Sequence, residues 1–246
     1  MCIRDSIGTT NFGTANPGAV TPHGMMSVVP FNVMGSEENV YDKDARWWST
    51  PYEYHNKFFT GFAHGALSGV GCPELGALLT MATTGPLTVD YREYGTSYRD
   101  EKASPGYYSV FLDRYKVKAE LTATQRAALH RYTFPASDEA GFILDMDYSI
   151  QHQTNMDMQV DVISDTEIKG YKLTEYWAFD QQISFYAKFS KPFTYQIVRD
   201  TLTDQNGKMQ PRCKVLLSFK TEKNEQVMVK ICLLYTSPSP RDLSTS

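Results

Sequence analysis

The stretch VKAELTAT, residues 117–124, alternates strictly between apolar and polar side chains. Its apolar members are Val117, Ala119, Leu121 and Ala123. Because successive side chains of a strand point to opposite faces, this period of two predicts a strand with one buried face and one face in water.

The same pattern recurs on the C-terminal side of this stretch. QISFYAKF (residues 182–189) and KVLLSFK (residues 214–220) each alternate, and DQNGK (residues 204–208) carries the Asn-Gly pair that favours a hairpin turn. LDRYK (residues 112–116) and SDTEIKG (residues 164–170) are typical of further reversals between strands. The chain has no long stretch with a period of 3.6 and no repeat of solenoid length. We therefore predict an all-β fold, a single large antiparallel β-sandwich without an internal domain boundary.

Composition excludes several classes of protein. The 246 residues are 41% hydrophobic, 13% aromatic and 21% charged, which is typical of a globular chain. The formal net charge is -4 and no basic stripe is present, so we expect no nucleic-acid partner. No apolar run is long enough to span a bilayer, and the start MCIRDS lacks the apolar core of a signal peptide.

Both ends of the sequence resemble peptides that arise when sequencing-adaptor DNA is translated. These ends are MCIRDS (residues 1–6) and the segment that begins CLLYTSPSPRD (residues 232–246). We expect the sandwich domain to cover residues 7–231 and the natural polypeptide to extend past both ends. Cys2 and Cys232 fall in these two adaptor-like ends. The remaining pair, Cys72 and Cys213, does not make a disulfide framework.

GFAHGALSGVGCPELG, residues 61–76, places a histidine, a cysteine and a carboxylate in a run of glycines. It contains no phosphate-binding glycine motif, and a zinc site would have only His64 and Cys72 as nearby ligands. Two interpretations remain open: a functional loop, or a tight connection between strands in which Cys72 is a small buried residue.

A second set of loops precedes it. Residues 7–31 are rich in glycine, asparagine and proline, and DARWWSTPYEYHNKFF (residues 44–59) sets two tryptophans beside an arginine. Trp47 and Trp48 would point to opposite faces of a strand. One indole could then stack on a sugar ring, or both could fill the core.

Three segments taken together resemble a known family. They are IGTTNFGTANPGAVTPHGMM (residues 7–26), GFAHGALSGVGCPELGALL (residues 61–79) and SPGYYSVFLDRYKVKAELTATQRAALHRYTFP (residues 104–135). They are similar to the N-terminal domain of glycoside hydrolase family 92, the calcium-dependent exo-α-mannosidases. The resemblance covers residues 7–231 and implies hydrolysis of a terminal α-mannoside of a mannose-containing glycan with inversion. It also implies that the sandwich forms one wall of a pocket whose other wall is a separate (α/α)6-barrel domain of the same chain, missing from this sequence.

The resemblance further implies where the chemistry lies. General acid, general base and most calcium contacts are expected from the barrel, so we expect no catalytic residue and no metal ligand in this chain and expect it to be inactive alone. The expected substrate-binding residues are Phe12, Gly13, Thr14, Asn16, Arg46, Trp47, Trp48, His64, Ser68, Gly69, Cys72 and Glu74. Many members carry further histidines in TANPGA (residues 14–19) and AHGALSGVGC (residues 63–72), and their loss here bears on linkage preference.

Other polar residues receive plainer interpretations. Asp145 and Asp147 in LDMDYS are interpreted as the solvated side of an alternating strand, and His130 as a structural histidine. The resemblance implies a secreted, periplasmic or cell-surface bacterial protein. The alternative function is a non-catalytic module that binds carbohydrate or protein.

Overall fold

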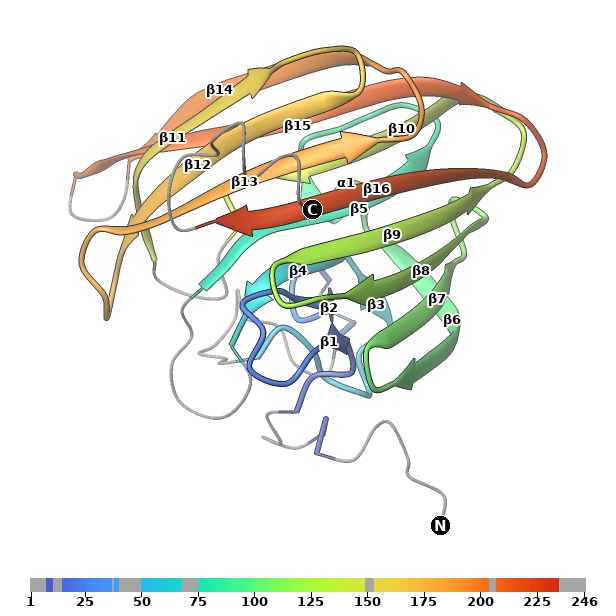
Figure 1. Cartoon of the computed structure of the whole chain (residues 1–246), viewed down its shortest axis with the longest axis horizontal. Helices are drawn as coiled ribbons and strands as arrows, with labels where there is room; N and C mark the ends of the chain where they lie inside the picture. Colours follow the sequence, from blue (N-terminus) through green and yellow to red (C-terminus); the bar gives the residue numbers. More distant parts are fainter. Residues whose placement is uncertain are drawn as a thin grey trace.

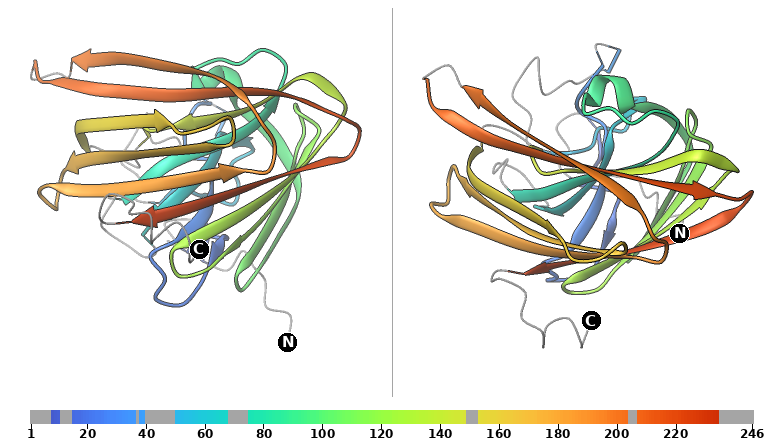
Figure 2. Two further views of the ribbon diagram at one scale, coloured as in Figure 1. Left: turned by 45° about the horizontal axis from the view of Figure 1, so that its top comes forward. Right: turned by 90° about the horizontal axis from the view of Figure 1, so that it is seen from above.

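The chain folds as two antiparallel β-sheets packed face to face (Figure 1). The computed structural model describes residues 8–10, 15–36, 38–39, 50–67, 75–148, 153–203 and 207–234. Figure 2 shows the two layers from two further directions, with the strands of both sheets strongly twisted. The predicted all-β sandwich is confirmed.

The first sheet has seven strands within the described residues. In spatial order they are β1 (Ala19–Val20), β2 (Ser27–Phe31), β4 (Gly61–Ala66), β5 (Leu75–Thr84), β10 (Ser137–Asp145), β15 (Met209–Thr221) and β14 (Thr194–Thr203). Residues far apart in sequence therefore become neighbours, since β5, β10 and β15 lie side by side.

The second sheet has nine strands within the same residues. Their order is β11 (Thr154–Val162), β12 (Glu167–Glu175), β13 (Gln181–Phe189), β16 (Glu225–Leu234), β9 (Ala127–Phe134), β8 (Val117–Ala123), β7 (Tyr107–Leu112), β6 (Thr96–Ser104) and β3 (Phe58–Phe59). A single helical turn, α1 (Tyr91–Tyr94), follows β5, and the Asp90 side chain caps it by accepting from the Arg92 amide.

The strands predicted by alternation are present. In β8 the four apolar side chains are buried and the residues between them are exposed or half-buried. The DQNGK segment connects β14 to β15, which pair antiparallel, and Gly207 has a φ of 78° as a hairpin turn requires. LDRYK and SDTEIKG likewise contain the reversals from β7 to β8 and from β11 to β12.

Aromatic side chains from both sheets form the core. Phe62 and Phe142 of the seven-stranded sheet contact Tyr132 of the nine-stranded sheet, with ring centroids 6.4 and 5.7 Å apart. A smaller apolar cluster covers the outer face of β2, β4 and β5 and includes Phe31 and Tyr148, whose rings meet edge to face at 4.6 Å. This part of the seven-stranded sheet is thus buried on both faces.

The C-terminal boundary differs from the expected one. Strand β16 continues to Leu234, and Cys232 and Leu233 are buried. Cys232 pairs with Tyr186 of β13 and Ala127 of β9, so residues 232–234 complete the sheet instead of forming an unpacked tail.

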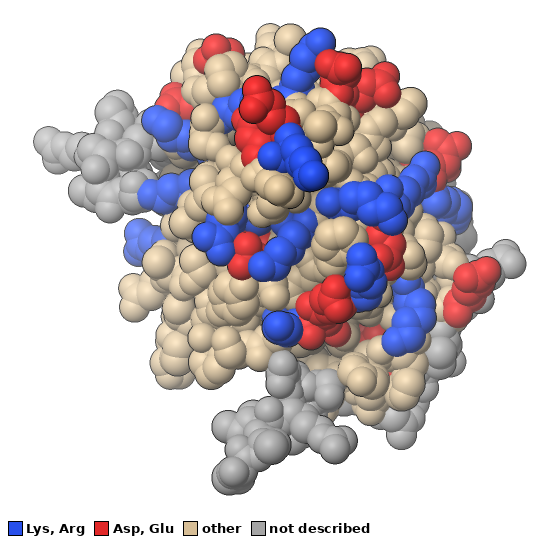
Figure 3. Space-filling model, turned by 90° about the vertical axis from the view of Figure 1, so that its right-hand side faces the viewer, with Lys and Arg blue, Asp and Glu red and all other residues tan. Residues whose placement is uncertain are grey.

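The surface carries charge of both signs. On the face shown in Figure 3, basic and acidic side chains are interspersed and neither sign forms a continuous field. Such a face offers no track for a phosphate backbone. Among the described residues, no helix has the length and apolar character needed to cross a membrane.

Candidate functional site

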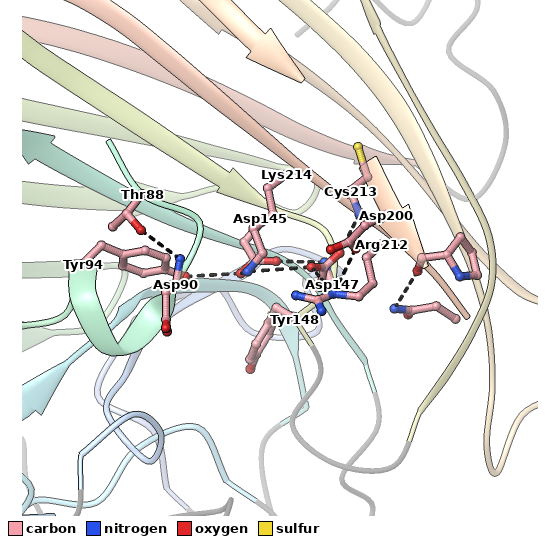
Figure 4. A network of polar contacts seen from close by, with 12 residues as sticks. Thr88, Asp90, Tyr94, Asp145, Asp147, Tyr148, Asp200, Arg212, Cys213 and Lys214 are labelled. Atoms are coloured by element: carbon pink, nitrogen blue, oxygen red, sulfur yellow. Dashed lines mark hydrogen bonds and ion pairs between the residues drawn. The ribbon is translucent and has the colours of Figure 1, made fainter. Parts of the chain in front are cut away.

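A polar pocket of about 510 Å³ opens on the outer face of the seven-stranded sheet. Asp145 and Asp147 reach it because they alternate with Leu144 and Met146, which point into the core. The pocket is lined by Met34, Val89, Asp90, Tyr91, Arg92, Asp145, Asp147, Tyr148, Leu202, Arg212 and Lys214. Figure 4 shows the charged side chains of β10 and β15 converging at its centre.

The carboxylate of Asp145 is buried and has a donor at each oxygen. Lys214, its register partner on β15, donates from Nζ to Oδ2 at 2.6 Å, and the Tyr94 hydroxyl donates to the same oxygen at 3.2 Å. The amide of Asp147 donates to Oδ1 at 2.8 Å. The Lys214 and Asp145 side chains are only 6% and 3% exposed, so this ion pair lies away from water.

Asp147 is held in the same way. The Cys213 amide donates to its Oδ1 at 2.6 Å, and Arg212 Nε donates to its Oδ2 at 3.1 Å. Burial and the neighbouring Asp145 carboxylate raise the pKa of Asp147, while Lys214 and Arg212 oppose this shift. Arg212 also reaches Asp200 Oδ1 at 3.4 Å, which extends the network to β14.

This network limits what the pocket can do. Every carboxylate oxygen of Asp145 and Asp147 accepts a hydrogen bond from within the protein, so both side chains are held as partners of β15. The arrangement ties β10 to β15 and can present Arg212, whose side chain is 35% exposed, to a polar ligand.

The interpretation of these two aspartates as a solvated strand face is wrong. Asp145 is 2% exposed and is paired with Lys214 of the adjacent strand, while Asp147 is paired with Arg212 of the same strand. Lys214 and Arg212 were missed as partners. The sequence does contain two cations two positions apart, Arg212 and Lys214, and two carboxylates with the same spacing. Nothing in the local sequence shows that β10 pairs with β15, which brings the two sets together.

A buried histidine pair joins the two sheets in the core. His64 of β4 and His130 of β9 are both 0% exposed, and their Nε2 atoms are 3.0 Å apart. His64 Nδ1 lies 3.3 Å from the Leu78 carbonyl oxygen. Because a carbonyl oxygen only accepts hydrogen bonds, Nδ1 carries the proton of the neutral His64 ring. His130 Nε2 then donates to His64, and His130 Nδ1 accepts from the Tyr132 hydroxyl at 2.8 Å.

These contacts leave both rings neutral. Burial lowers the pKa of His64 to about 4, and burial together with His64 lowers the pKa of His130 well below its ordinary value. The interpretation of His130 as a structural histidine is confirmed. For His64, full burial and two occupied ring nitrogens do not support a direct contact with a sugar hydroxyl.

The pair predicts acid-sensitive stability. Between the folded pKa of about 4 and the unfolded value near 6.5, the unfolded chain binds more protons at His64, so stability falls as pH falls through this window. We expect the linkage at His64 alone to lower the free energy of unfolding by about 2 kcal/mol between pH 7 and pH 5. His130 should lower it further. Urea unfolding at both pH values measures it.

The test uses a double variant that combines His64→Gln and His130→Gln. His23→Asn is the control. His23 is exposed and has a φ of 57°, which asparagine tolerates. The double variant should flatten the pH dependence and the control should keep it. An unchanged slope in the double variant would contradict the role of the pair.

Most predicted substrate-binding residues lie outside the described residues. These are Phe12, Gly13, Thr14, Arg46, Trp47, Trp48, Ser68, Gly69, Cys72 and Glu74. Their placement, and the alternatives for Trp47, Trp48 and Cys72, stay predictions. The two described residues of the set are His64, in the core, and Asn16.

Asn16 links two of the predicted loops. Its Nδ2 donates to the carbonyl of Leu67 at 3.3 Å, which brings the first loop beside the end of β4, one residue before the glycine-rich segment 68–74. Its Oδ1 is buried, and among the described residues it has no hydrogen-bond partner. That orphaned acceptor is a group that a ligand hydroxyl or a water could satisfy.

The backbone is strained where the chain leaves segment 68–74. Leu75 has a φ of 68° and Gly76 a φ of 79°, so two consecutive residues are left-handed. A bulky side chain seldom adopts this conformation, and such strain is concentrated at functional sites. Gly76 is required because a Cβ there would lie 2.8 Å from the Tyr148 ring.

A buried lysine lies beside Leu75 and Gly76. Lys172 of β12 is 2% exposed and donates from Nζ to the Tyr148 carbonyl at 2.6 Å, joining the nine-stranded sheet to the end of β10. Burial lowers its pKa to about 8, against the opposing effect of Asp145 and Asp147. Lys172, Gln153, Thr174 and Gln181 make the gap between the sheets polar next to Leu75 and Gly76.

Comparison with known proteins gives one consistent result. The family model of the glycosyl hydrolase family 92 N-terminal domain matches residues 3–233. The family GH92 alpha-mannosidase BT3965 from Bacteroides thetaiotaomicron, also solved in complex with mannoimidazole, is 30% identical with a TM-score of 0.79 over 96% of this chain.

Two further matches agree with it. The family GH92 inverting mannosidase BT2199 of the same organism shares the fold at 19% identity, with a TM-score of 0.68 over 94% of this chain. An uncharacterized secreted glycosidase of Arthroderma benhamiae is 32% identical over 149 residues, 54% of this chain. The chain spans 32% of the length of the BT3965 structure, 30% of BT2199 and 17% of the Arthroderma protein.

Proposed function

Because the chain belongs to the glycosyl hydrolase family 92 N-terminal domain family, we propose that it is the N-terminal part of an exo-acting, inverting α-mannosidase. In this proposal it forms one wall of the pocket that holds the terminal mannose of a glycan. The observation that carries the proposal is the 30% identity to an α-mannosidase over 96% of the chain.

The pocket wall is proposed to lie at the end of the sandwich where Asn16 meets Leu67. The contact joins the first predicted loop to the start of the second, and the strained pair at Leu75 and Gly76 closes the same segment. Both features support a ligand-facing edge assembled from segments that are distant in sequence.

The acid and the base are proposed to come from a different part of the enzyme. Inversion requires two carboxyl groups roughly 6.5–9.5 Å apart, one to protonate the leaving oxygen and one to activate water. Asp145 and Asp147 are poorly suited to this task, because Lys214, Arg212 and backbone amides already hold their carboxylates in ion pairs and hydrogen bonds. A helical (α/α)6-barrel domain of the same protein is the proposed source and the proposed domain partner.

The described residues supply no calcium site built from acidic side chains alone. No group of three or more His, Cys, Asp or Glu side chains in the described ranges could hold a metal ion, and the pocket carboxylates are already paired. We propose that the complete enzyme binds calcium through ligands outside these residues. The protein is further proposed to act outside the cytoplasm, since the Arthroderma relative is a secreted glycosidase.

The direct test is an assay of the full-length protein encoded by the complete gene. With an α-mannobioside we expect mannose release from the non-reducing end, with the β-anomer appearing first in a proton NMR time course. A chelator should abolish the activity and added calcium should restore it. An initial α-anomer would contradict inversion. Complete inactivity would favour the non-catalytic binding module instead.

A further inference from the structure

The hairpin between β12 and β13 ends in exposed aromatic side chains. Trp177 is 65% exposed and Phe179 is 80% exposed, and both lie in the short connection between Glu175 and Gln181. Large apolar side chains exposed in pairs at a loop tip cost solvation free energy, so they favour a binding role over a purely structural one.

We propose that Trp177 and Phe179 form a stacking surface for the sugar units of a mannoside that lie beyond the terminal mannose. This inference rests on the proposed function. It assigns the hairpin a role in selecting longer glycans and no role in bond cleavage.

The hairpin arises next to the proposed pocket wall. Thr174 and Gln181 stand at its base and share a small cavity with Leu75 and Gly76, the two residues that follow segment 68–74. Lys172, two residues before Thr174 on β12, also contacts the Tyr148 carbonyl. The aromatic tip therefore projects from strands that border Leu75 and Gly76, at the edge proposed for the pocket wall.

The local geometry keeps the rings on the surface. The Tyr176 amide donates to the Ala178 carbonyl at 3.2 Å, which closes a tight turn around Trp177. The half-buried Tyr176 ring lies 6.3 Å from the Trp177 ring and tilts by 51°, so it supports one side of the indole. Asp180 is exposed beside Phe179 and offers its carboxylate to sugar hydroxyls.

The size of the surface favours a sugar over a protein. An aromatic side chain has about 150–250 Å² of surface, so the two rings expose roughly 300 Å² together. A stable protein interface needs about 800 Å² on each partner, and its core is depleted of charge. Two rings with a carboxylate beside them match instead the apolar face and hydroxyl rim of a few sugar units.

The test is kinetic, on the full-length enzyme carrying Trp177→Ala and Phe179→Ala together. For an α-mannotriose we expect kcat/KM to fall about tenfold through KM, the usual scale for losing an aromatic contact. For 4-nitrophenyl α-mannoside, which carries no sugar unit beyond the terminal mannose, kcat/KM should be unchanged. Tyr195→Ala is the control, since Tyr195 is 54% exposed on β14.

Each other outcome overturns the proposal. Equal losses on both substrates would place the effect on the active site or on packing against another domain, and no loss on either would show that the rings do not contact the substrate. If the wild-type enzyme hydrolyses neither substrate, the proposed function fails separately. The hairpin is then judged by electrophoresis in native gels containing α-mannan. Retardation that the double variant loses supports the stacking surface, and retardation that it retains, or none in the wild type, refutes it.

Discussion

A polypeptide of residues 1–246 alone is expected to release no mannose from an α-mannoside above the uncatalysed rate. A general acid and a general base each contribute typically 10²–10⁴-fold, so a chain without both loses at least about 10⁴-fold, and more when the sugar is not oriented. The two aspartates of the pocket are not expected to replace them, because Lys214, Arg212 and backbone amides hold their carboxylates in ion pairs and hydrogen bonds.

The comparison that measures this uses two proteins under the same conditions. One is the polypeptide of residues 1–246 and the other is the full-length enzyme, both assayed on an α-mannobioside with calcium and with a chelator. Circular dichroism typical of β-structure is the control that the short chain is folded. Calcium-dependent release of mannose by the short chain would show that the acid and base lie within residues 1–246.

Removing the cation of the buried ion pair is expected to give the largest loss of stability. Lys214→Met leaves the Asp145 carboxylate in a site that is 3% exposed, where the Tyr94 hydroxyl and a backbone amide are its remaining donors among the described residues. An uncompensated buried charge costs about 3–5 kcal/mol, so we expect the free energy of unfolding to fall by that amount.

A matched pair of variants separates burial from pairing. Lys220 and Asp138 also pair between β15 and β10 at 3.0 Å, but their side chains are 78% and 85% exposed, so Lys220→Met should cost less than about 1 kcal/mol. Adding Asp145→Asn to Lys214→Met removes the unpaired charge and should recover part of the loss. Urea unfolding at pH 7 measures all four proteins. Equal effects of Lys214→Met and Lys220→Met would refute the role of burial.

The sequence alone determined the class of fold and the family. A period of two in VKAELTAT, QISFYAKF and KVLLSFK specifies strands, because successive side chains of a strand point to opposite faces. It does not specify solvation, since Ser184 and Leu216, on the faces expected to be in water, are buried. Asn206 and Gly207 specify a hairpin for a similarly local reason, since few residues tolerate positive φ. The glycine-rich segment and its flanking motifs carried the family resemblance without any knowledge of the fold.

Only the tertiary structure decided which polar residues are buried and which partners they contact. An aspartate two positions from another aspartate has the same local pattern whether water or a cation faces it, so the burial of Asp145 depends on β10 pairing with β15, some 70 residues later in the chain. His64 looked like a loop ligand among glycines, yet the packing of β4 against β9 placed it against His130, 66 residues away. Local sequence fixes the direction in which a side chain points, whereas its solvation is set by the strand or sheet that packs against it.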